Sequence, residues 1–122
     1  MRGFGDLEAA IMDQLWSAGA ARTVRELHTT LSDERDLAYN TVLTVTDNLY
    51  KKGWLRREQA GRAHRYTPVA SRAQYGAGLM RSALESAGDP RQTLLQFVGQ
   101  MSPDEAAALR EALTGLEEQA RP

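Results

Sequence analysis

The chain has 122 residues, and its 15 lysines and arginines nearly balance 16 aspartates and glutamates, so the formal net charge is −1. One or two small domains are expected at this length. With 42% hydrophobic and 25% charged residues, the composition is that of a folded globular protein and excludes an intrinsically disordered chain.

The sequence also excludes several classes of protein by what it lacks. It has no cysteine, so disulfides, thiolate nucleophiles and cysteine-based metal sites are excluded. No apolar run approaches the roughly 20 residues that span a bilayer, and residues 1–6 do not have the pattern of a signal peptide. We therefore expect a cytoplasmic protein with no stable membrane association.

The charges are unevenly distributed along the chain. Residues 1–34 have three basic and six acidic residues, residues 35–68 have seven and three, and residues 69–122 have five and seven. The three segments therefore have net charges of −3, +4 and −2. A basic segment of this kind can attract a polyanion such as a nucleic acid, although a solvated basic surface explains the charge equally well.

Two helices are predicted at the start of the chain. The first spans residues 6–18, with Asp6 as its N-cap and Gly19 after its end. The second begins after Thr23, which forms a capping box with Glu26. The apolar residues that recur at helical spacing, and that we expect to face a core, are Leu7, Ile11, Met12, Leu15, Trp16, Val24, Leu27 and Leu31.

A third helix is predicted from about residue 38 to residue 52, ending at Gly53. Its inner face is expected to contain Val42, Val45 and Leu49. At 100° per residue, the polar residues on the opposite face and beside it are Asn40, Thr41, Thr44, Asp47, Asn48 and Lys51.

After Gly53 the hydrophobic period changes from helical to two. Residues 54–58 and 63–67 are predicted to be strands, joined by a glycine-containing turn at residues 59–62 and ended by Pro68. Three helices followed by a basic β-hairpin indicate a mainly α protein with a winged helix-turn-helix domain. Trp54 and Tyr66, on opposite strands, are interpreted as packing residues rather than base-stacking platforms.

The remaining residues are predicted to form helices over 71–87, over about 91–100 and from Ser102 onwards. A segment of about 54 residues is too short to bury a good core alone, so its leucine stripe favours packing against a second copy of the chain. The alternative is that this segment folds back on the N-terminal domain. We therefore predict a winged-helix DNA-binding domain over residues 1–69 and a helical dimerisation domain over residues 70–122. The residues predicted to mediate dimerisation are Tyr75, Leu79, Leu94, Phe97, Leu109, Leu113 and Leu116.

The exposed face of the third helix has the side chains that read base edges. In a helix-turn-helix protein the second helix of the motif lies in the major groove. Asparagine pairs with adenine, threonine suits thymine, and lysine binds guanine or phosphate. Asp47 either accepts a hydrogen bond from cytosine or neutralises Lys51 one helical turn away, and we favour the second interpretation.

Basic residues also follow the predicted hairpin. They are expected to bind phosphates or enter the minor groove, with Arg62 at the tip best placed. Their alternative role is to protect exposed strands from aggregation. These residues are Arg56, Arg57, Arg62 and Arg65.

No catalytic motif is found. The sequence lacks GxxxxGK, GxGxxG after a strand, GxSxG and HExxH. His28 has no histidine or acid at ligand spacing, and His64 is predicted to be a surface strand residue. We expect no enzymatic activity, no cofactor and no metal.

Five segments together resemble the BlaI/MecI family of penicillinase repressors, which are winged helix-turn-helix transcriptional regulators. They are residues 7–16 (LEAAIMDQLW), 23–27 (TVREL), 39–44 (YNTVLT), 51–53 (KKG) and 61–68 (GRAHRYTP). The resemblance implies a homodimeric repressor that binds palindromic operators in double-stranded DNA, upstream of β-lactam-resistance or related stress genes. It implies that Thr41, Thr44 and their neighbours on the third helix contact DNA, assisted by the wing around Arg62. Together with the exposed face of that helix and the basic hairpin, this gives the residues that we predict to bind DNA: Tyr39, Asn40, Thr41, Thr44, Asn48, Lys51, Arg62 and Arg65.

The resemblance also implies how repression ends. In the family, signalling from a membrane sensor-protease leads to cleavage of an Asn-Phe bond in the dimerisation region, and the matching residues here are Gln96 and Phe97. Asn48 stands where many members have arginine. The cysteine cluster of the copper-responsive branch is absent. Two alternatives are a winged-helix protein-interaction module and a repressor released by a small ligand.

Overall fold

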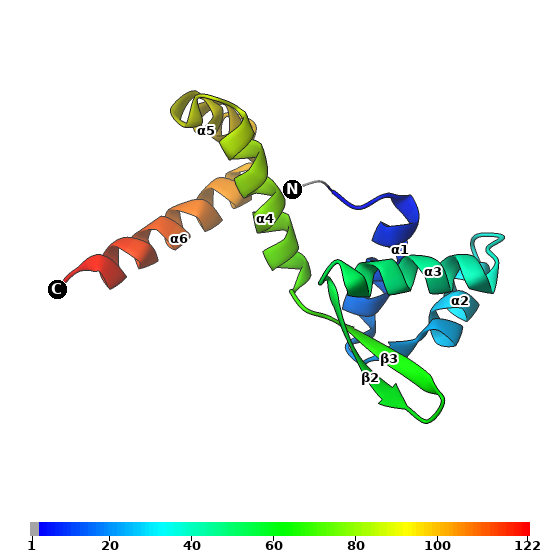
Figure 1. Cartoon of the computed structure of the whole chain (residues 1–122). Coiled ribbons are helices and arrows are strands. Elements are labelled where there is room, and N and C mark those ends of the chain that lie inside the picture. Colours follow the sequence, from blue (N-terminus) through cyan, green and yellow to red (C-terminus); the bar gives the residue numbers. More distant parts are fainter. Residues whose placement is uncertain (1–2) are drawn as a thin grey trace. The chain divides into compact units, whose positions relative to one another are not determined.

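The computed structural model describes residues 3–122. Two compact units are divided between Leu79 and Met80, and we call them the N-terminal and C-terminal units. The elements, labelled in Figure 1, are α1 (Asp6–Ala18), β1 (Arg22–Thr23), α2 (Val24–Ser32), α3 (Tyr39–Lys51), β2 (Leu55–Ala60), β3 (Ala63–Pro68), α4 (Arg72–Ser86), α5 (Pro90–Val98) and α6 (Pro103–Ala120). Three helices followed by a hairpin confirm the predicted mainly α, winged helix-turn-helix fold.

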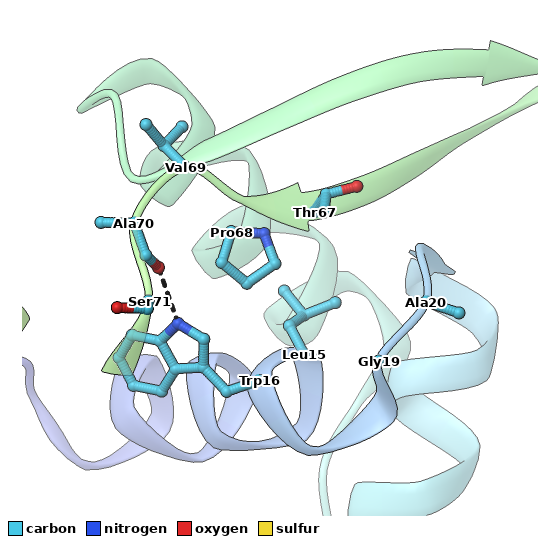
Figure 2. Close-up of a pocket in the computed structure, with 9 residues that line it drawn as sticks. All are labelled: Leu15, Trp16, Gly19, Ala20, Thr67, Pro68, Val69, Ala70 and Ser71. Carbon is cyan, nitrogen blue, oxygen red and sulfur yellow. Dashed lines mark hydrogen bonds between the residues drawn. The ribbon is translucent and has the colours of Figure 1, made fainter. Parts of the chain in front are cut away.

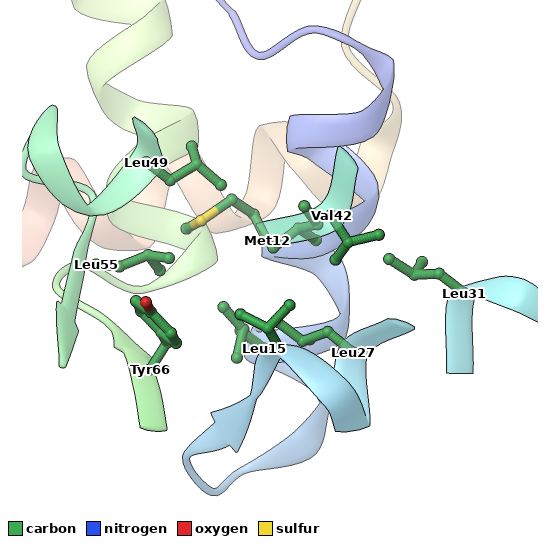
Figure 3. Packing of buried hydrophobic residues seen from close by; sticks show 10 residues of the cluster. Met12, Leu15, Leu27, Leu31, Val42, Leu49, Leu55 and Tyr66 are labelled. Carbon is green, nitrogen blue, oxygen red and sulfur yellow. The ribbon is translucent and has the colours of Figure 1, made fainter. Parts of the chain in front are cut away.

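The core of the N-terminal unit lies between α1, α2, α3 and the base of the sheet (Figure 3). Removal of these apolar side chains from water is the main favourable contribution to folding of the unit. Leu7 and Trp16, predicted to face the core, are partly buried and pack against it. The buried hydrophobic residues are Ile11, Met12, Leu15, Val24, Leu27, Leu31, Val42, Leu49, Leu55 and Tyr66.

The start of α1 differs from the prediction, because Asp6 is not its N-cap. Gly5 has the extended backbone of the N-cap position, and its N–H donates to Glu8 Oε1 at 3.1 Å. The carboxylate that closes this helix end is therefore that of Glu8. The predicted left-handed conformation of Gly19 after the helix is confirmed, with φ of 65°.

The capping box of α2 is confirmed. Thr23 Oγ1 accepts from the Glu26 N–H at 3.2 Å, and Glu26 Oε1 accepts from the Thr23 N–H at 3.0 Å. Thr23 also belongs to β1, which was not predicted and pairs with β3. A strand of two residues has too little sequence for a period to be detected.

The inner face of α3 includes a residue that was not predicted. Val45 is partly buried and packs against the core as predicted, but Thr46 is fully buried together with Val42 and Leu49. The Thr46 hydroxyl donates to the Val42 carbonyl at 2.7 Å, so its polar group is satisfied within the helix itself. This hydrogen bond removes the penalty that would otherwise exclude a hydroxyl from the core.

The sheet has the order β1–β3–β2, with both pairings antiparallel. Ala60 pairs with Ala63, so the turn is formed by Gly61 and Arg62 alone and is shorter than the predicted turn over residues 59–62. Gly61 has φ of 65°, and a positive φ at the first central position is typical of a type II′ hairpin turn. The turn therefore places Arg62 at the tip of the wing.

The start of α4 belongs to the N-terminal unit through an aromatic cluster of Phe4, Trp16, Trp54 and Tyr75. The Phe4 and Tyr75 rings stack with centroids 4.3 Å apart, and the Phe4 N–H donates to the Tyr75 hydroxyl at 2.9 Å. The Trp54 ring meets Tyr75 edge-on. The packing roles predicted for Trp54 and Tyr66 are confirmed, whereas Tyr75, predicted to mediate dimerisation, contacts aromatic residues of its own chain.

A shallow cleft of about 250 Å³ lies beside this cluster (Figure 2). The Trp16 indole N–H donates to the Ala70 carbonyl at 2.9 Å across one side of the cleft. This bond ties the segment between β3 and α4 to α1. The lining residues are Leu15, Trp16, Gly19, Ala20, Thr67, Pro68, Val69, Ala70 and Ser71.

The predicted helices of the tail are present with slightly different ends. Asp89, in the break between α4 and α5, is the N-cap of α5 and accepts from the Gln92 N–H at 3.2 Å. The capping box of Ser102 and Glu105 at the start of α6 is also present. Within residues 72–120, all of which the structure describes, α4, α5 and α6 bury no side chain completely.

Candidate nucleic-acid interface

The exposed side of α3 brings together five of the predicted DNA-binding residues, and we call this surface the reading face. Because Val42, Thr46 and Leu49 point into the core, helical geometry directs the opposite side of α3 to solvent. The side chains of this surface are short and polar, except for one longer lysine. Their amides and hydroxyls can pair with base edges. The residues of the reading face are Asn40, Thr41, Thr44, Asn48 and Lys51, and all are exposed.

Asp47 lies at the edge of the reading face and forms ion pairs with two basic side chains. Its Oδ2 is 3.0 Å from Lys51 Nζ, and its Oδ1 is 3.4 Å from an Arg57 guanidinium nitrogen. The pairing with Lys51 one turn later is the interpretation that we favoured from the sequence. The pairing with Arg57 was not predicted, since it joins α3 to the wing.

Arg57 is held by the protein on several sides. Its guanidinium carbon lies 4.0 Å from the centroid of the Tyr50 ring, a cation–π distance. A hydrogen bond with the Tyr66 side chain, with a further contribution from Asp47, raises the pKa of Arg57 above its ordinary value. The predicted role of Arg57 as a phosphate contact does not fit this placement, because its guanidinium is already engaged. Arg57 instead fixes the wing against α3.

The other wing arginines are oriented differently. Residues directly opposite each other on paired antiparallel strands share a face. Arg57 lies opposite the buried Tyr66 and so faces α3, whereas Arg56 and Arg65 lie on the other face of the hairpin. Arg62 stands in the turn. Arg62 and Arg65, both predicted to contact DNA, are exposed at different parts of the wing.

The first residue of α3, Tyr39, is 39% exposed and was predicted to contact DNA. Its ring meets His28 edge-on at 5.8 Å, and the Arg25 guanidinium carbon lies 5.9 Å from its centroid. Arg25, on α2, thus places a positive charge beside the start of the reading face. The sequence analysis did not predict this contribution of Arg25. No local pattern indicates this contact, since α2 and α3 meet only in the folded unit.

Neither histidine has the surroundings of a metal ligand set. Within residues 3–122, no group of three histidine, cysteine or acidic residues is close enough to hold a metal ion. His28 Nε2 lies 2.7 Å from the Leu37 carbonyl oxygen. His64 is half-buried rather than a surface residue as predicted, because its ring packs beside Tyr66 with centroids 6.5 Å apart.

The C-terminal unit exposes large apolar side chains. One is Met80 on α4, which is 56% exposed, and the others lie on α5 and α6 and are between 42% and 63% exposed. The predicted dimerisation residues Leu79 and Leu109 are half-buried within the chain, and the predicted cleavage residues Gln96 and Phe97 lie in α5. The exposed apolar residues of these two helices are Leu94, Leu95, Phe97, Val98, Leu113 and Leu116.

Comparison of the sequence with known proteins identifies its family. A family model described as penicillinase repressor matches residues 4–115. The chain is 49% identical over 116 residues to the transcriptional regulator BlaI of two Mycobacterium tuberculosis strains, CDC 1551 / Oshkosh and ATCC 25618 / H37Rv. That match covers 93% of this chain and 84% of each relative.

Two solved structures are each similar to about three-fifths of the chain. The solution structure of the DNA-binding domain of the repressor BlaI has 27% identity and a TM-score of 0.53, and the match covers 62% of this chain and 94% of that chain. The monomeric form of Bacillus licheniformis BlaI, solved in complex with the blaP half-operator, has 27% identity and a TM-score of 0.51, covering 61% and 89%. Across residues 3–122, no helix has both the length and the apolar character needed to cross a membrane.

Proposed function

The chain belongs to the BlaI/MecI family of penicillinase repressors, and on that premise we propose that it binds a palindromic operator as a homodimer, through the reading face and the wing. It is a transcriptional repressor of the BlaI type. The family consists of transcriptional regulators, so the chain is not an enzyme.

The observation that carries the proposed DNA contact is the grouping of exposed amide, hydroxyl and ammonium groups on one side of α3. A related BlaI with the same fold is known in complex with a half-operator. We propose that α3 lies in the major groove and that Arg62 meets the adjacent backbone or minor groove. Arg65 and Tyr39 contribute at the two ends of the surface. The proposed base-reading residues are Asn40, Thr41, Thr44 and Asn48, with Lys51 on guanine or phosphate.

The proposed dimer is supported by the exposed apolar residues of α5 and α6. A face of large apolar side chains in contact with water is unfavourable, and a second copy of the chain would cover it. A winged-helix unit of this size also gains affinity when two copies bind two half-sites. We therefore propose that Leu94, Phe97, Leu113 and Leu116 lie in the dimer interface, with Leu79 and Leu109 at its edges.

For regulation, we propose control of β-lactam-resistance or related stress genes and inactivation by cleavage between Gln96 and Phe97, downstream of a membrane sensor-protease. Both residues lie in the helix α5, so cleavage requires local unwinding of that helix. The loss of the helix would remove Phe97 from the proposed interface. In this proposal the protein acts in the cytoplasm.

A footprint of the purified protein on DNA upstream of its own gene tests the proposed function. We expect a protected region with twofold symmetry, and a complex that weakens as salt rises. A shuffled duplex of the same composition is the control. Equal affinity for the two duplexes at moderate salt would contradict sequence-specific repression and favour a protein-interaction module.

A further inference from the structure

A carboxylate at the edge of a surface that meets DNA is unfavourable by simple electrostatics. Asp47 lies beside the reading face, next to Lys51, where a DNA phosphate would repel it. Asp47 lies within residues 35–68, the most basic segment of the chain, whose net charge is +4. Its position therefore needs a physical reason.

Stability does not supply that reason. The side chains of Asp47, Lys51 and Arg57 are 32%, 68% and 30% exposed, and ion pairs at such exposure contribute little to folding. Arg57 would also stay in place without the carboxylate, because its guanidinium carbon lies 4.0 Å from the centroid of the Tyr50 ring and its strand pairs it with the buried Tyr66. The group that depends most on Asp47 is Lys51, whose ammonium is held at 3.0 Å.

The effect of this ion pair differs between the two kinds of DNA complex. Binding to DNA of arbitrary sequence is driven almost entirely by cations that neutralise phosphates. A lysine that is paired with its own carboxylate contributes less to such binding. In an operator complex, the base contacts of α3 fix the helix in the groove and bring Lys51 to DNA, so that the ion pair is exchanged for a DNA contact.

From this geometry we infer that Asp47 is a specificity-determining residue, which weakens sequence-independent DNA binding by keeping Lys51 paired until α3 is docked on its operator. The inference rests on the proposed DNA-binding function. Specificity is a difference between two affinities, and an element that penalises the wrong complex increases it. Asp47 performs this role with one carboxylate and no base contact of its own.

The test substitution is Asp47→Asn, which keeps the shape of the side chain and removes its charge. On a random-sequence duplex, we expect the salt slope of log K to steepen by about one unit, since Lys51 gains a phosphate. The corresponding gain in affinity is about fivefold at 0.15 M salt. On the upstream operator duplex we expect an unchanged salt slope and a smaller gain. The ratio of operator to random affinity therefore falls.

Asp13→Asn is the matched control. Asp13 lies on α1 and forms an ion pair with Arg72, with the charged atoms 3.5 Å apart. The Asp13→Asn variant therefore has the same change in net charge as Asp47→Asn and also loses one exposed ion pair. The variant with both Asp47→Asn and Lys51→Ala should return the random-duplex slope to that of the unmodified protein. A thermal melt of each variant verifies folding.

Three results would overturn the inference. Equal effects of Asp47→Asn and Asp13→Asn would mean that only net charge matters. A loss of operator affinity with random-duplex binding unchanged would show that Asp47 reads a base. An unchanged random-duplex slope would show that Lys51 is not restrained. The proposed function itself fails if the unmodified protein binds the operator duplex no more tightly than the random duplex. The affinity of the unmodified protein for the two duplexes shows this outcome separately from the effect of Asp47→Asn.

Discussion

The N-terminal and C-terminal units use their apolar residues in opposite ways. The former encloses ten of them in one core, and the hydroxyl of the buried Thr46 is hydrogen-bonded. In the latter, Leu113 and Leu116 are 50% and 63% exposed, although they lie on a well-capped helix. Local capping signals can therefore define a helix without giving it a core. The first unit has a core of its own, whereas the second exposes apolar side chains that a partner copy would cover in the dimer that we propose.

The largest expected effect comes from placing a charge on the exposed apolar face of the C-terminal unit. Leu113→Asp puts a carboxylate where we propose that the two copies meet, and burial of an unpaired charge is strongly unfavourable. We expect a monomer in analytical ultracentrifugation and an operator affinity lower by about 10²–10⁴-fold, because two linked half-sites no longer bind together. The thermal melt of the N-terminal unit should not change.

A charge on the polar side of the same helix is the control. Glu111→Lys is also on α6, and its side chain is exposed. It should leave the oligomeric state and the affinity for the operator nearly unchanged. A Leu113→Asp protein that still sediments as a dimer would place the interface elsewhere in the chain.

Removal of core volume tests the other half of the comparison. Leu49 is fully buried, so Leu49→Ala should reduce the free energy of unfolding of the N-terminal unit by about 2–5 kcal/mol. The effect should be the same at low and high protein concentration, since the cavity lies within one chain. Denaturant unfolding followed by tryptophan fluorescence measures it.

Leu95→Ala provides the matched substitution in the C-terminal unit. Leu95 is 55% exposed, so the same truncation should destabilise a monomer by less than about 1 kcal/mol. A loss as large as that of Leu49→Ala, seen only at high protein concentration, would mean that the side chain is buried between copies. A large loss independent of concentration would contradict the division that we draw between the units.

Within the N-terminal unit, the arginines of the wing sharpen the comparison between groups that hold the fold and groups left for DNA. Arg62→Ala should make the salt slope of operator binding shallower by about one, because the tip arginine meets a phosphate. Arg57→Ala should leave the slope unchanged, since this guanidinium is bound to Asp47 and stacked on Tyr50. Gel-shift titrations at several salt concentrations separate the two. A change of slope in both variants would mean that Arg57 leaves its protein partners on DNA.

The features that were predicted correctly are those that depend on near neighbours in sequence. Thr23 and Glu26 are three residues apart, and helix geometry alone brings the cap and its partner together. The polar side of α3 follows in the same way from a period of 3.6 residues. The reading face could therefore be predicted from the order of residues in one helix.

The features that were missed depend on where distant elements meet, or on a bond that a hydrophobicity pattern does not contain. Thr46 was missed because its hydroxyl is satisfied by the carbonyl four residues earlier, which makes a polar residue acceptable in a core. The contacts of Arg57 with Asp47 and Tyr50 arise only when the wing closes on α3. For the same reason Tyr75 was assigned to an interface, although Phe4, 71 residues earlier, covers it.

The smallest expected effect is the loss of stability when a capping carboxylate is neutralised, which we compare between Glu8 of the N-terminal unit and Glu105 of the C-terminal unit. Glu8 and Glu105 each accept the backbone N–H of their own N-cap, which lowers the pKa of both groups. Only Glu8 has a distant partner as well, with Oε2 3.2 Å from Lys52 Nζ at the end of α3. Glu8→Gln should therefore reduce the stability of the N-terminal unit by about 0.5 kcal/mol, whereas Glu105→Gln should only fray the start of α6.

The pH dependence of the Glu8 effect follows from the direction of its pKa shift. Because the folded-state pKa lies below the ordinary value of 4.5, the carboxylate contributes its full stabilisation above that value and loses it as the pH falls through the folded-state pKa. The difference in melting temperature between the unmodified protein and Glu8→Gln should thus be constant near neutral pH and vanish in acid. Glu105→Gln should show no such difference for the N-terminal unit at any pH. An equal decrease of melting temperature in Glu8→Gln and Glu105→Gln would mean that the contact of Glu8 with Lys52 adds no stability beyond the local cap. The two units would then not differ in how their helix ends are joined to the rest of the fold.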